Sequence, residues 1–321
     1  APAYGGTPSD ESVRQAIREL KARGLEVTLY PFVFMDCPGY PWRGRVAGVD
    51  GAGATVEIAA LFGGPDDWGL RRMALHYARI AADEGADGLL IGSEMRGVTW
   101  TRDAAGGFPA VDQFRALAAE CRAVVGPEVK LSYAADWSEY FGHQPDDGSR
   151  DVFFHLDPLW ADPAIDFIGI DNYMPLSDWR EGSGHADAAA GSIHDLDYLT
   201  ANVAGGEGYD WYYATPEDRA AQRRTPITDG AGEPWIWRYK DILNWWRNPH
   251  HDRVGGVRQA AASPWVPMSK PIWFTEIGCA AVDKGTNEPN KFVDPKSSES
   301  ALPHFSTGAR DDLIQMQYLR A

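Results

Sequence analysis

Amphipathic segments and nearly continuous apolar runs alternate along this chain of 321 residues. Three segments show the 3.6-residue spacing of a helix with one apolar face: residues 7–24, 66–85 and 111–126. Five short runs are apolar at almost every position, as buried strands are: residues 25–34, 86–92, 129–135, 165–171 and 271–276. Strands of this kind, separated by helices, predict a parallel sheet that is covered on both faces.

Local signals mark the ends of the first of these elements. Thr7 is expected to cap the first helix, Pro8 to occupy its first position and Gly24 to end it. Pro31 lies inside the first apolar run. Because proline cannot donate to a sheet ladder, it weakens the prediction of a strand at the middle of that run.

Acidic residues distinguish between the two folds that successive βα units form, a closed barrel and an open doubly wound sheet. One lies at or just beyond the carboxyl end of each predicted strand: Asp36, Glu94, Asp136, Asp171 and Glu276. In a TIM barrel these ends form one rim that faces a common centre. No GxGxxG or GxxxxGK[ST] phosphate-binding pattern follows a strand. The sequence therefore predicts an α/β fold of the TIM (β/α)8 type.

Residues 176–266 separate the last two predicted strands and are too many for an ordinary connection. They are rich in Gly, Asp, Trp and Tyr, and they contain a helix signal at residues 215–224. We expect a single domain over residues 1–321, in which residues 176–266 form an insertion beside the barrel mouth.

The net charge of −16 would repel a phosphate backbone, so direct nucleic-acid binding is not expected. No signal peptide is visible, and no apolar run approaches the length of a membrane span. Cys37, Cys121 and Cys279 form no disulfide or metal pattern, and we expect buried free thiols.

The stretch "NPHHD" contains His250, His251 and Asp252, which are residue types that bind metals. Adjacent histidines in a strand point to opposite sides, and no other ligand has helix spacing. We therefore expect a surface loop rather than a metal site here.

Glu94 and Glu276 each follow an apolar run, and this placement suits glycoside hydrolysis. That reaction uses two carboxyl groups that flank one bond: one protonates the leaving oxygen, and the other attacks the sugar or activates water. Two rigid strands that converge on one cleft would hold the groups in place. The alternative is that each glutamate pairs with an arginine or caps a helix.

The pair resembles the acid/base and the nucleophile at the ends of barrel strands four and seven in the large clan of retaining glycoside hydrolases. This resemblance implies that the five predicted strands are strands three to seven. Strands 1 and 2 would then precede Ala1, and strand 8 would follow Ala321. The segment is therefore expected to lack strands 1, 2 and 8, or to close its barrel in an atypical way.

Several longer motifs carry a closer resemblance, among them "IGSEMRG", "FIGIDNYMPLSDWR", "KPIWFTEIGC" and "FVDPKSSESALPHF". Over essentially the whole chain they resemble the TIM-barrel-like domain of gene transfer agent and phage tail hub proteins. The resemblance implies a glycoside-hydrolase-like module in the tail tip or baseplate hub of a phage-like particle that is made in the bacterial cytoplasm. Its expected substrate is bacterial envelope polysaccharide, with cell-wall peptidoglycan as one candidate. Its other expected partners are tail and baseplate proteins, and no cofactor is implied.

The resemblance also assigns roles to individual residues. Glu94 matches the acid/base, Glu276 the nucleophile, and Tyr173 the tyrosine that donates a hydrogen bond to the nucleophile. Ser93 departs from the clan, which usually has Asn in this position to contact the sugar 2-hydroxyl. A shorter side chain would leave room for a larger 2-substituent such as N-acetyl, or it would signal lost activity. The residues expected to contact sugar hydroxyls are Asp36, Asp136, Trp137, Asp171 and Asn172.

Two other functions remain open at this stage. The barrel would be a catalytically inactive structural or glycan-binding module of the tail baseplate if the fold has been kept and the catalytic activity lost. A barrel enzyme with metal-held carboxylates is less favoured, because no group of histidines accompanies the strand ends.

Overall fold

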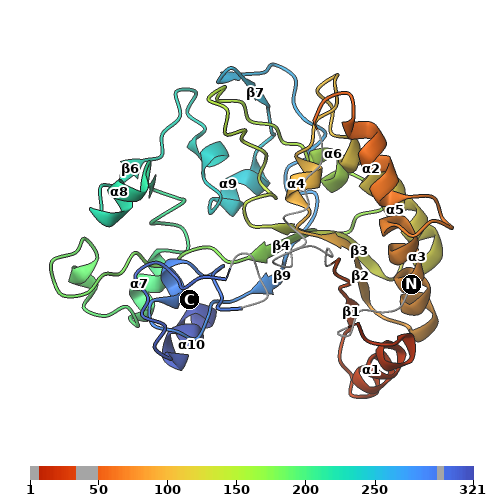
Figure 1. Ribbon diagram of the computed structural model, residues 1–321, viewed down its shortest axis with the longest axis horizontal. Helices are drawn as coiled ribbons and strands as arrows, with labels where there is room; N and C mark the ends of the chain where they lie inside the picture. The colour runs from red at the N-terminus through yellow and green to blue at the C-terminus, as the bar shows by residue number, and fades with distance from the viewer. Residues whose placement is uncertain (1–6, 34–49, 295–299) are drawn as a thin grey trace.

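The computed structural model describes residues 7–33, 50–294 and 300–321. Its central feature is a parallel sheet of five strands in the order β1-β2-β3-β4-β9 (Figure 1). These strands are β1 (Thr28–Leu29), β2 (Gly88–Ser93), β3 (Lys130–Asp136), β4 (Ile168–Asn172) and β9 (Ile272–Ile277). Each of the five predicted apolar runs therefore contributes one strand.

The strand order confirms the prediction of a barrel-type fold. An open doubly wound sheet reverses its strand order at a switch point. In this sheet every strand pairs with the sheet strand that precedes it in the chain, and the order never reverses. The described residues thus form a half-barrel of five consecutive parallel strands.

The first strand is much shorter than the apolar run that predicts it. Only Thr28–Leu29 pair with β2, although the run extends over residues 25–34. Pro31 follows two residues later and has no N–H to donate to a ladder, which agrees with the weaker prediction at that point.

Helices cover one face of the sheet. Before and between the strands lie α1 (Asp10–Ala22), α2 (Ala54–Phe62), α3 (Leu70–Glu84), α4 (Arg96–Thr99), α5 (Pro109–Val125) and α6 (Asp157–Trp160). The predicted cap of α1 is wrong by two residues. Ser9, not Thr7, is the N-cap, because the Ser9 side chain accepts the Ser12 N–H at 3.2 Å.

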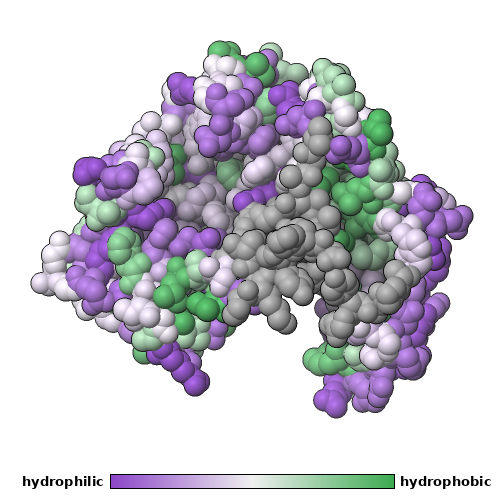
Figure 2. All heavy atoms as spheres, viewed as in Figure 1, coloured by the Kyte–Doolittle hydropathy of each residue, from purple (hydrophilic) through white to green (hydrophobic). Residues whose placement is uncertain are grey.

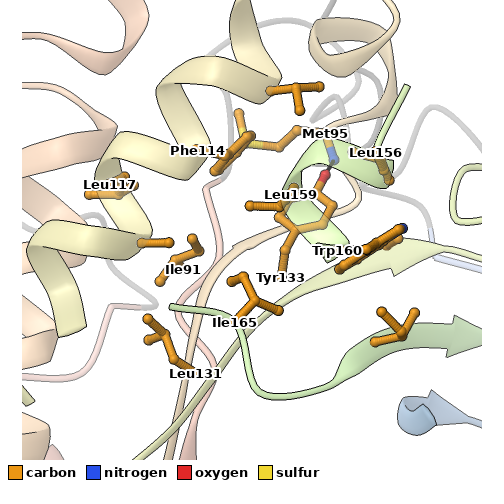
Figure 3. Packing of buried hydrophobic residues seen from close by; sticks show 14 of the residues in the cluster. Ile91, Met95, Phe114, Leu117, Leu131, Tyr133, Leu156, Leu159, Trp160 and Ile165 are labelled. Carbon is orange, nitrogen blue, oxygen red and sulfur yellow. Dashed lines mark hydrogen bonds between the residues drawn. The ribbon is translucent and has the colours of Figure 1, made fainter. Parts of the chain in front are cut away.

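The main core lies between the helices and the outer face of the sheet (Figure 3). Ile91 and Leu131 of the sheet pack there with Phe114 and Leu117 of α5. The opposite face of the sheet has a smaller cluster, made of Leu90, Ala134 and Phe167. The side chains therefore alternate between the two faces, as they must in a strand that is covered on both sides.

The inner face contains an open pocket of about 230 Å³. Phe167 and Trp273 stack in it with ring centroids 4.0 Å apart, and Tyr30 and Thr275 also line it. Trp273 and its neighbour Phe274 remain 39% and 47% exposed. The surface of the whole molecule, as seen in Figure 2, is mostly hydrophilic, with some apolar patches.

Residues between β4 and β9 form many short elements. These are η2 (Ala188–Ala190), α7 (Leu196–Ala201), β5 (Trp211–Tyr212), α8 (Pro216–Ala220), β6 (Thr225–Pro226), η3 (Pro234–Trp237), α9 (Ile242–Arg247), β7 (Arg253–Val254) and β8 (Val257–Arg258). After β9 come η4 (Gly285–Asn287) and α10 (Asp312–Arg320). The helix signal at residues 215–224 gives α8, which Thr215 caps through the Asp218 N–H.

Several hydrogen bonds attach this long segment to the rest of the chain. Tyr140, which follows β3, donates its hydroxyl to the Tyr239 carbonyl at 2.7 Å. The buried Lys240 ammonium donates to the carbonyls of Pro175, at 2.6 Å, and Gly205, at 2.8 Å. Lys240 thus ties the chain just after β4 to a later turn of the same segment.

We expect the stabilising effect of Lys240 to increase with pH. Burial lowers the pKa of its ammonium to about 7, although the charges of Glu207 and Asp210 raise it. Lysine in an unfolded chain has a pKa of about 10.4. Between these values the unfolded chain binds more protons, so stability rises with pH. The free energy of unfolding of the wild type, minus that of Lys240→Met, should therefore grow by up to about 1.4 kcal/mol per pH unit from pH 7 to 10.

Urea unfolding at several pH values measures this difference, and other titrating groups cancel in the subtraction. Lys270→Met serves as a comparison. Burial lowers the pKa of Lys270 only to about 8, so the effect of this variant on stability should begin to grow at a higher pH. A difference that stays constant with pH would show that Lys240 keeps its charge in the folded protein.

The prediction of a surface loop at "NPHHD" is wrong for His250. Its side chain is completely buried, with Nδ1 2.8 Å from Asp157 Oδ2 and Nε2 2.7 Å from the Trp245 carbonyl oxygen. It stacks between Phe154 and Trp265. Both of its nitrogens therefore face acceptors inside an aromatic core, which explains why these polar residues fold inward.

Two thiols behave as the sequence predicts. Cys121 and Cys279 are buried and free, and burial raises the pKa of each to about 12. Cys37 lies outside the described residues. None of the helices in the described ranges is both long enough and apolar enough to cross a membrane.

Candidate active site

Two irregularities in the strand pairing place the candidate carboxylates. Between the pairs Leu90–Ser132 and Ser93–Ala134, β2 has one residue more than β3. Between Ile170–Phe274 and Asp171–Glu276, β9 has one residue more than β4, and this extra residue is Thr275. A bulge bends a strand and changes the direction of its side chains. The bulge in β9 lies directly before Glu276, and the bulge in β2 ends one residue before Glu94, at the paired Ser93.

Three carboxylates meet at this end of the sheet. One oxygen each from Glu94, Asp171 and Glu276 lies within 4.8 Å of the others. Asp171 is completely buried, Glu94 is 4% exposed and Glu276 is half-buried. Residues that are 182 positions apart in the chain thus come together, as a common barrel rim requires.

Glu94 occupies an unusual backbone conformation. Its φ angle is 48°, in the left-handed region that costs an L-residue other than glycine about 1–2 kcal/mol. Its N–H donates to the Ala134 carbonyl at 2.8 Å. Strain of this kind persists only where surrounding contacts enforce it, and it is common at functional sites.

Glu276 is held by the tyrosine that directly follows the neighbouring strand, β4. The Tyr173 hydroxyl donates to Glu276 Oε2 at 2.8 Å. Burial, the charge of Glu276 and this hydrogen bond together raise the pKa of Tyr173 well above its usual value. The phenol therefore stays protonated and keeps donating to the carboxylate.

Asp171 accepts hydrogen bonds at both of its oxygens. The Tyr30 hydroxyl donates to Oδ2 at 2.5 Å, and the Thr275 hydroxyl donates to Oδ1 at 2.7 Å. The Tyr30 oxygen also lies 2.7 Å from Ser93 Oγ. Strands β2, β4 and β9 and residue Tyr30 therefore share one partly buried polar network that includes Asp171, the neighbour of the two glutamates.

Comparison with known families identifies the domain. A family model described as the GTA TIM-barrel-like domain matches residues 68–321, which is most of the chain. The chain belongs to the GTA TIM-barrel-like domain family. Comparison with curated proteins gives no match.

The GTA domain is also similar to several solved structures. One is a GH113 beta-1,4-mannanase, with 18% identity, a TM-score of 0.45, and coverage of 97% of this chain and 62% of that chain. A complex structure of a GH113 beta-1,4-mannanase has 17% identity, a TM-score of 0.47 and the same coverage. The GH113 beta-mannanase AaManA from Alicyclobacillus acidocaldarius, in complex with ManMIm, has 22% identity, a TM-score of 0.36, and coverage of 60% of this chain and 51% of that chain. The GTA domain thus spans 62% of the length of the first two.

The other residues expected to contact sugar lie in different settings. Asp136 accepts the Ser138 N–H at 2.7 Å and lies 3.8 Å from the Arg96 guanidinium. Trp137 is half-buried and packs edge-on against Tyr239 at 4.7 Å. Asn172 Oδ1 accepts the Met174 N–H at 3.1 Å. Asp36 lies outside the described residues. Sugar contact by these residues stays a prediction.

Some residues of the site were not expected from the sequence. Tyr30 and Thr275 donate to Asp171, Tyr133 accepts the N–H of Met95, the residue after Glu94, and Glu139 accepts from Tyr133. Thr275 precedes Glu276 and breaks the apolar run, which is a signal that sequence analysis can use. Tyr30 gives no such signal, because an aromatic residue in an apolar strand predicts core packing.

The three carboxylates also form the group within the described ranges that has the spacing of a metal site. A set of carboxylate oxygens would suit a hard cation such as Mg²⁺ or Ca²⁺. Hydroxyl donors, however, already bind oxygens of Asp171 and Glu276. This arrangement supports a role in proton or group transfer more directly than a role in metal binding.

We expect removal of the Tyr30 hydroxyl to destabilise the domain. The change Tyr30→Phe takes one of its hydrogen-bond donors from the buried carboxyl group of Asp171, and the loss of such a bond costs about 1–3 kcal/mol. Urea unfolding measures the change, with Tyr212→Phe as the control because Tyr212 is 46% exposed. A loss below about 0.5 kcal/mol would mean that Asp171 does not depend on this bond.

Proposed function

We propose that this GTA domain is a retaining glycoside hydrolase that acts on bacterial envelope polysaccharide, as part of a phage-like tail hub. The observation that carries the proposal is the approach of Glu94 and Glu276, whose nearest oxygens lie within 4.8 Å. Carboxyl groups about 5–5.5 Å apart are typical of retaining enzymes, and inverting enzymes hold theirs about 6.5–9.5 Å apart. The short distance therefore supports retention.

In the proposed reaction Glu276 attacks the anomeric carbon, while Glu94 gives its proton to the leaving oxygen. Glu94 then takes a proton from water, and that water releases the sugar from Glu276. The burial of Glu94 suits a group that transfers a proton inside a site from which water is largely excluded. The hydrogen bond from Tyr173 suits Glu276, since it stabilises the ionised nucleophile.

Release of fragments from envelope glycans tests this proposal. The purified domain is incubated with cell-wall sacculi and with capsular polysaccharide, and mass spectrometry detects soluble products. Products from the wild type that are absent with Glu276→Gln are the expected result. Binding to a glycan without any release would favour the alternative, an inactive glycan-binding module of the baseplate.

Ser93 offers a test of substrate class within the same assay. Its Oγ lies 2.7 Å from the Tyr30 hydroxyl, so the side chain turns toward the carboxylate network. We expect a small side chain here to favour sugars with a 2-N-acetyl group. Ser93→Asn should lower kcat/KM on N-acetylated glycans about 10-fold relative to plain glycans, because the amide fills that space. An equal effect on both classes would remove Ser93 from the determinants of specificity.

A further inference from the structure

A fourth carboxylate, that of Glu139, contacts Tyr133 and Thr99 on either side of the turn that follows Glu94, and it has no part in the proposed reaction. Its side chain is completely buried. The Thr99 hydroxyl donates to Glu139 Oε1 at 2.5 Å, and the Asp136 N–H donates to Oε2 at 3.2 Å. The Tyr133 hydroxyl lies 3.0 Å from Oε1. Three donors, one from α4 and two from β3, therefore converge on one buried acceptor.

Tyr133 connects Glu139 to the residue next to Glu94. The Tyr133 oxygen accepts the Met95 N–H at 2.7 Å, and Figure 3 shows this bond from the strand to the turn. The hydroxyl proton of Tyr133 is then free to be donated to Glu139. Its ring is completely buried, with Phe114 on one side at a centroid distance of 4.9 Å. The hydroxyl therefore has a fixed position.

Thr99 provides a second connection from Glu139 to the same turn. Met95 is the N-cap of α4 and Thr99 is its last residue, so the two contacts hold both ends of this short helix. Glu94 lies directly before it in the left-handed conformation. A strained residue keeps its conformation only if the adjacent chain is fixed. Here Glu139 fixes both ends of α4, the helix that follows Glu94.

We propose that Glu139 is a positioning residue, which acts through Tyr133 and Thr99 to hold the turn that directs Glu94 toward Glu276. The catalytic part of this inference rests on the proposed function, and the structural part does not. Burial and the charge of Asp136 raise the pKa of Glu139, the bonds from Thr99 and Tyr133 lower it, and the pKa that results is about 8. The accepted hydrogen bonds thus offset only part of the desolvation of the carboxyl group.

The variants Glu139→Leu, which removes both acceptor oxygens, and Tyr133→Phe test the proposal, with Tyr140→Phe as a matched control. Tyr140 is equally buried and also bonds through its hydroxyl, to the Tyr239 carbonyl at 2.7 Å, but this bond is remote from the turn of Glu94. Hydrogen exchange of the Met95 amide is the first measurement. We expect its protection to fall by about 10-fold or more in both test variants and to stay within about 2-fold in the control.

The second measurement compares two leaving groups. A glycan needs protonation of its leaving oxygen, whereas a dinitrophenyl glycoside of the same sugar does not. We expect kcat of both test variants to fall about 10–100-fold on the glycan, with KM unchanged, and less than about 3-fold on the aryl glycoside. A structural role alone would lower both rates equally.

The outcomes separate the inference from the proposed function. Unchanged protection of Met95 in Glu139→Leu, or equal losses on the two substrates, would overturn the positioning role. If the wild type releases nothing from any glycan, the proposed function fails, and the exchange of Met95 still decides whether Glu139 holds the turn.

Discussion

Glu276→Gln is expected to lower kcat/KM on the cleaved glycan by about 10³-fold or more, which corresponds to about 4 kcal/mol of transition-state stabilisation. Glutamine has almost the shape of glutamate and can keep the contact with Tyr173. It lacks the anionic oxygen that forms the bond to the anomeric carbon. Steady-state kinetics on the glycan that the wild type cleaves give this value directly.

The shorter variant Glu276→Ala makes the expectation more specific. Added azide should enter the space of the missing carboxylate and yield a glycosyl azide of inverted anomeric configuration, which NMR identifies. Glu57→Gln is the control, because Glu57 is exposed on α2 and away from the carboxylate cluster. Retained activity in Glu276→Gln would show that this residue is not the nucleophile.

Glu94→Gln is expected to lower kcat on a glycan by about 10²–10⁴-fold, the usual contribution of a general acid. The loss should be less than about 10-fold for bond cleavage in a dinitrophenyl glycoside, because this leaving group departs without a proton. The second step would then limit turnover, so a burst of dinitrophenol should precede slow release of the sugar. Stopped-flow absorbance detects such a burst.

Azide again provides the contrasting test. In Glu94→Ala it should attack the glycosyl-enzyme and give a product of retained configuration, opposite to the product expected from Glu276→Ala. The same configuration from both variants would contradict the assignment of the two roles. Loss of folded protein, which circular dichroism detects, would remove a variant from the comparison.

The sequence predicts the sheet well because its signals are local. A glycine after an amphipathic helix, followed by an apolar run, predicts strand after strand, and the carboxylates at the run ends predict which side holds the site. Glu94, Asp171 and Glu276 do meet there. The bulges that orient these carboxylates were not predicted. An extra residue in β9 can be recognised only from the way in which β9 pairs with β4.

The remaining differences come from contacts between distant residues. His250 looks like a loop residue until Asp157, 93 positions earlier, provides a buried partner. Glu139 looks like a surface residue until Thr99 and Tyr133 surround it. Ser9, rather than Thr7, caps α1. Both residues have a hydroxyl group that can cap a helix, and residue type alone does not decide between them.

At position 94, the residue that would be best for stability differs from the residue that catalysis requires. Glycine would adopt this conformation without strain, and asparagine would adopt it more easily than glutamate. Selection for a sturdy scaffold alone would therefore favour either of them over the acid, whereas selection for bond cleavage would retain the acid despite its strain. Relatives of this domain that have glycine or asparagine at this position are those in which we expect the barrel to have become purely architectural.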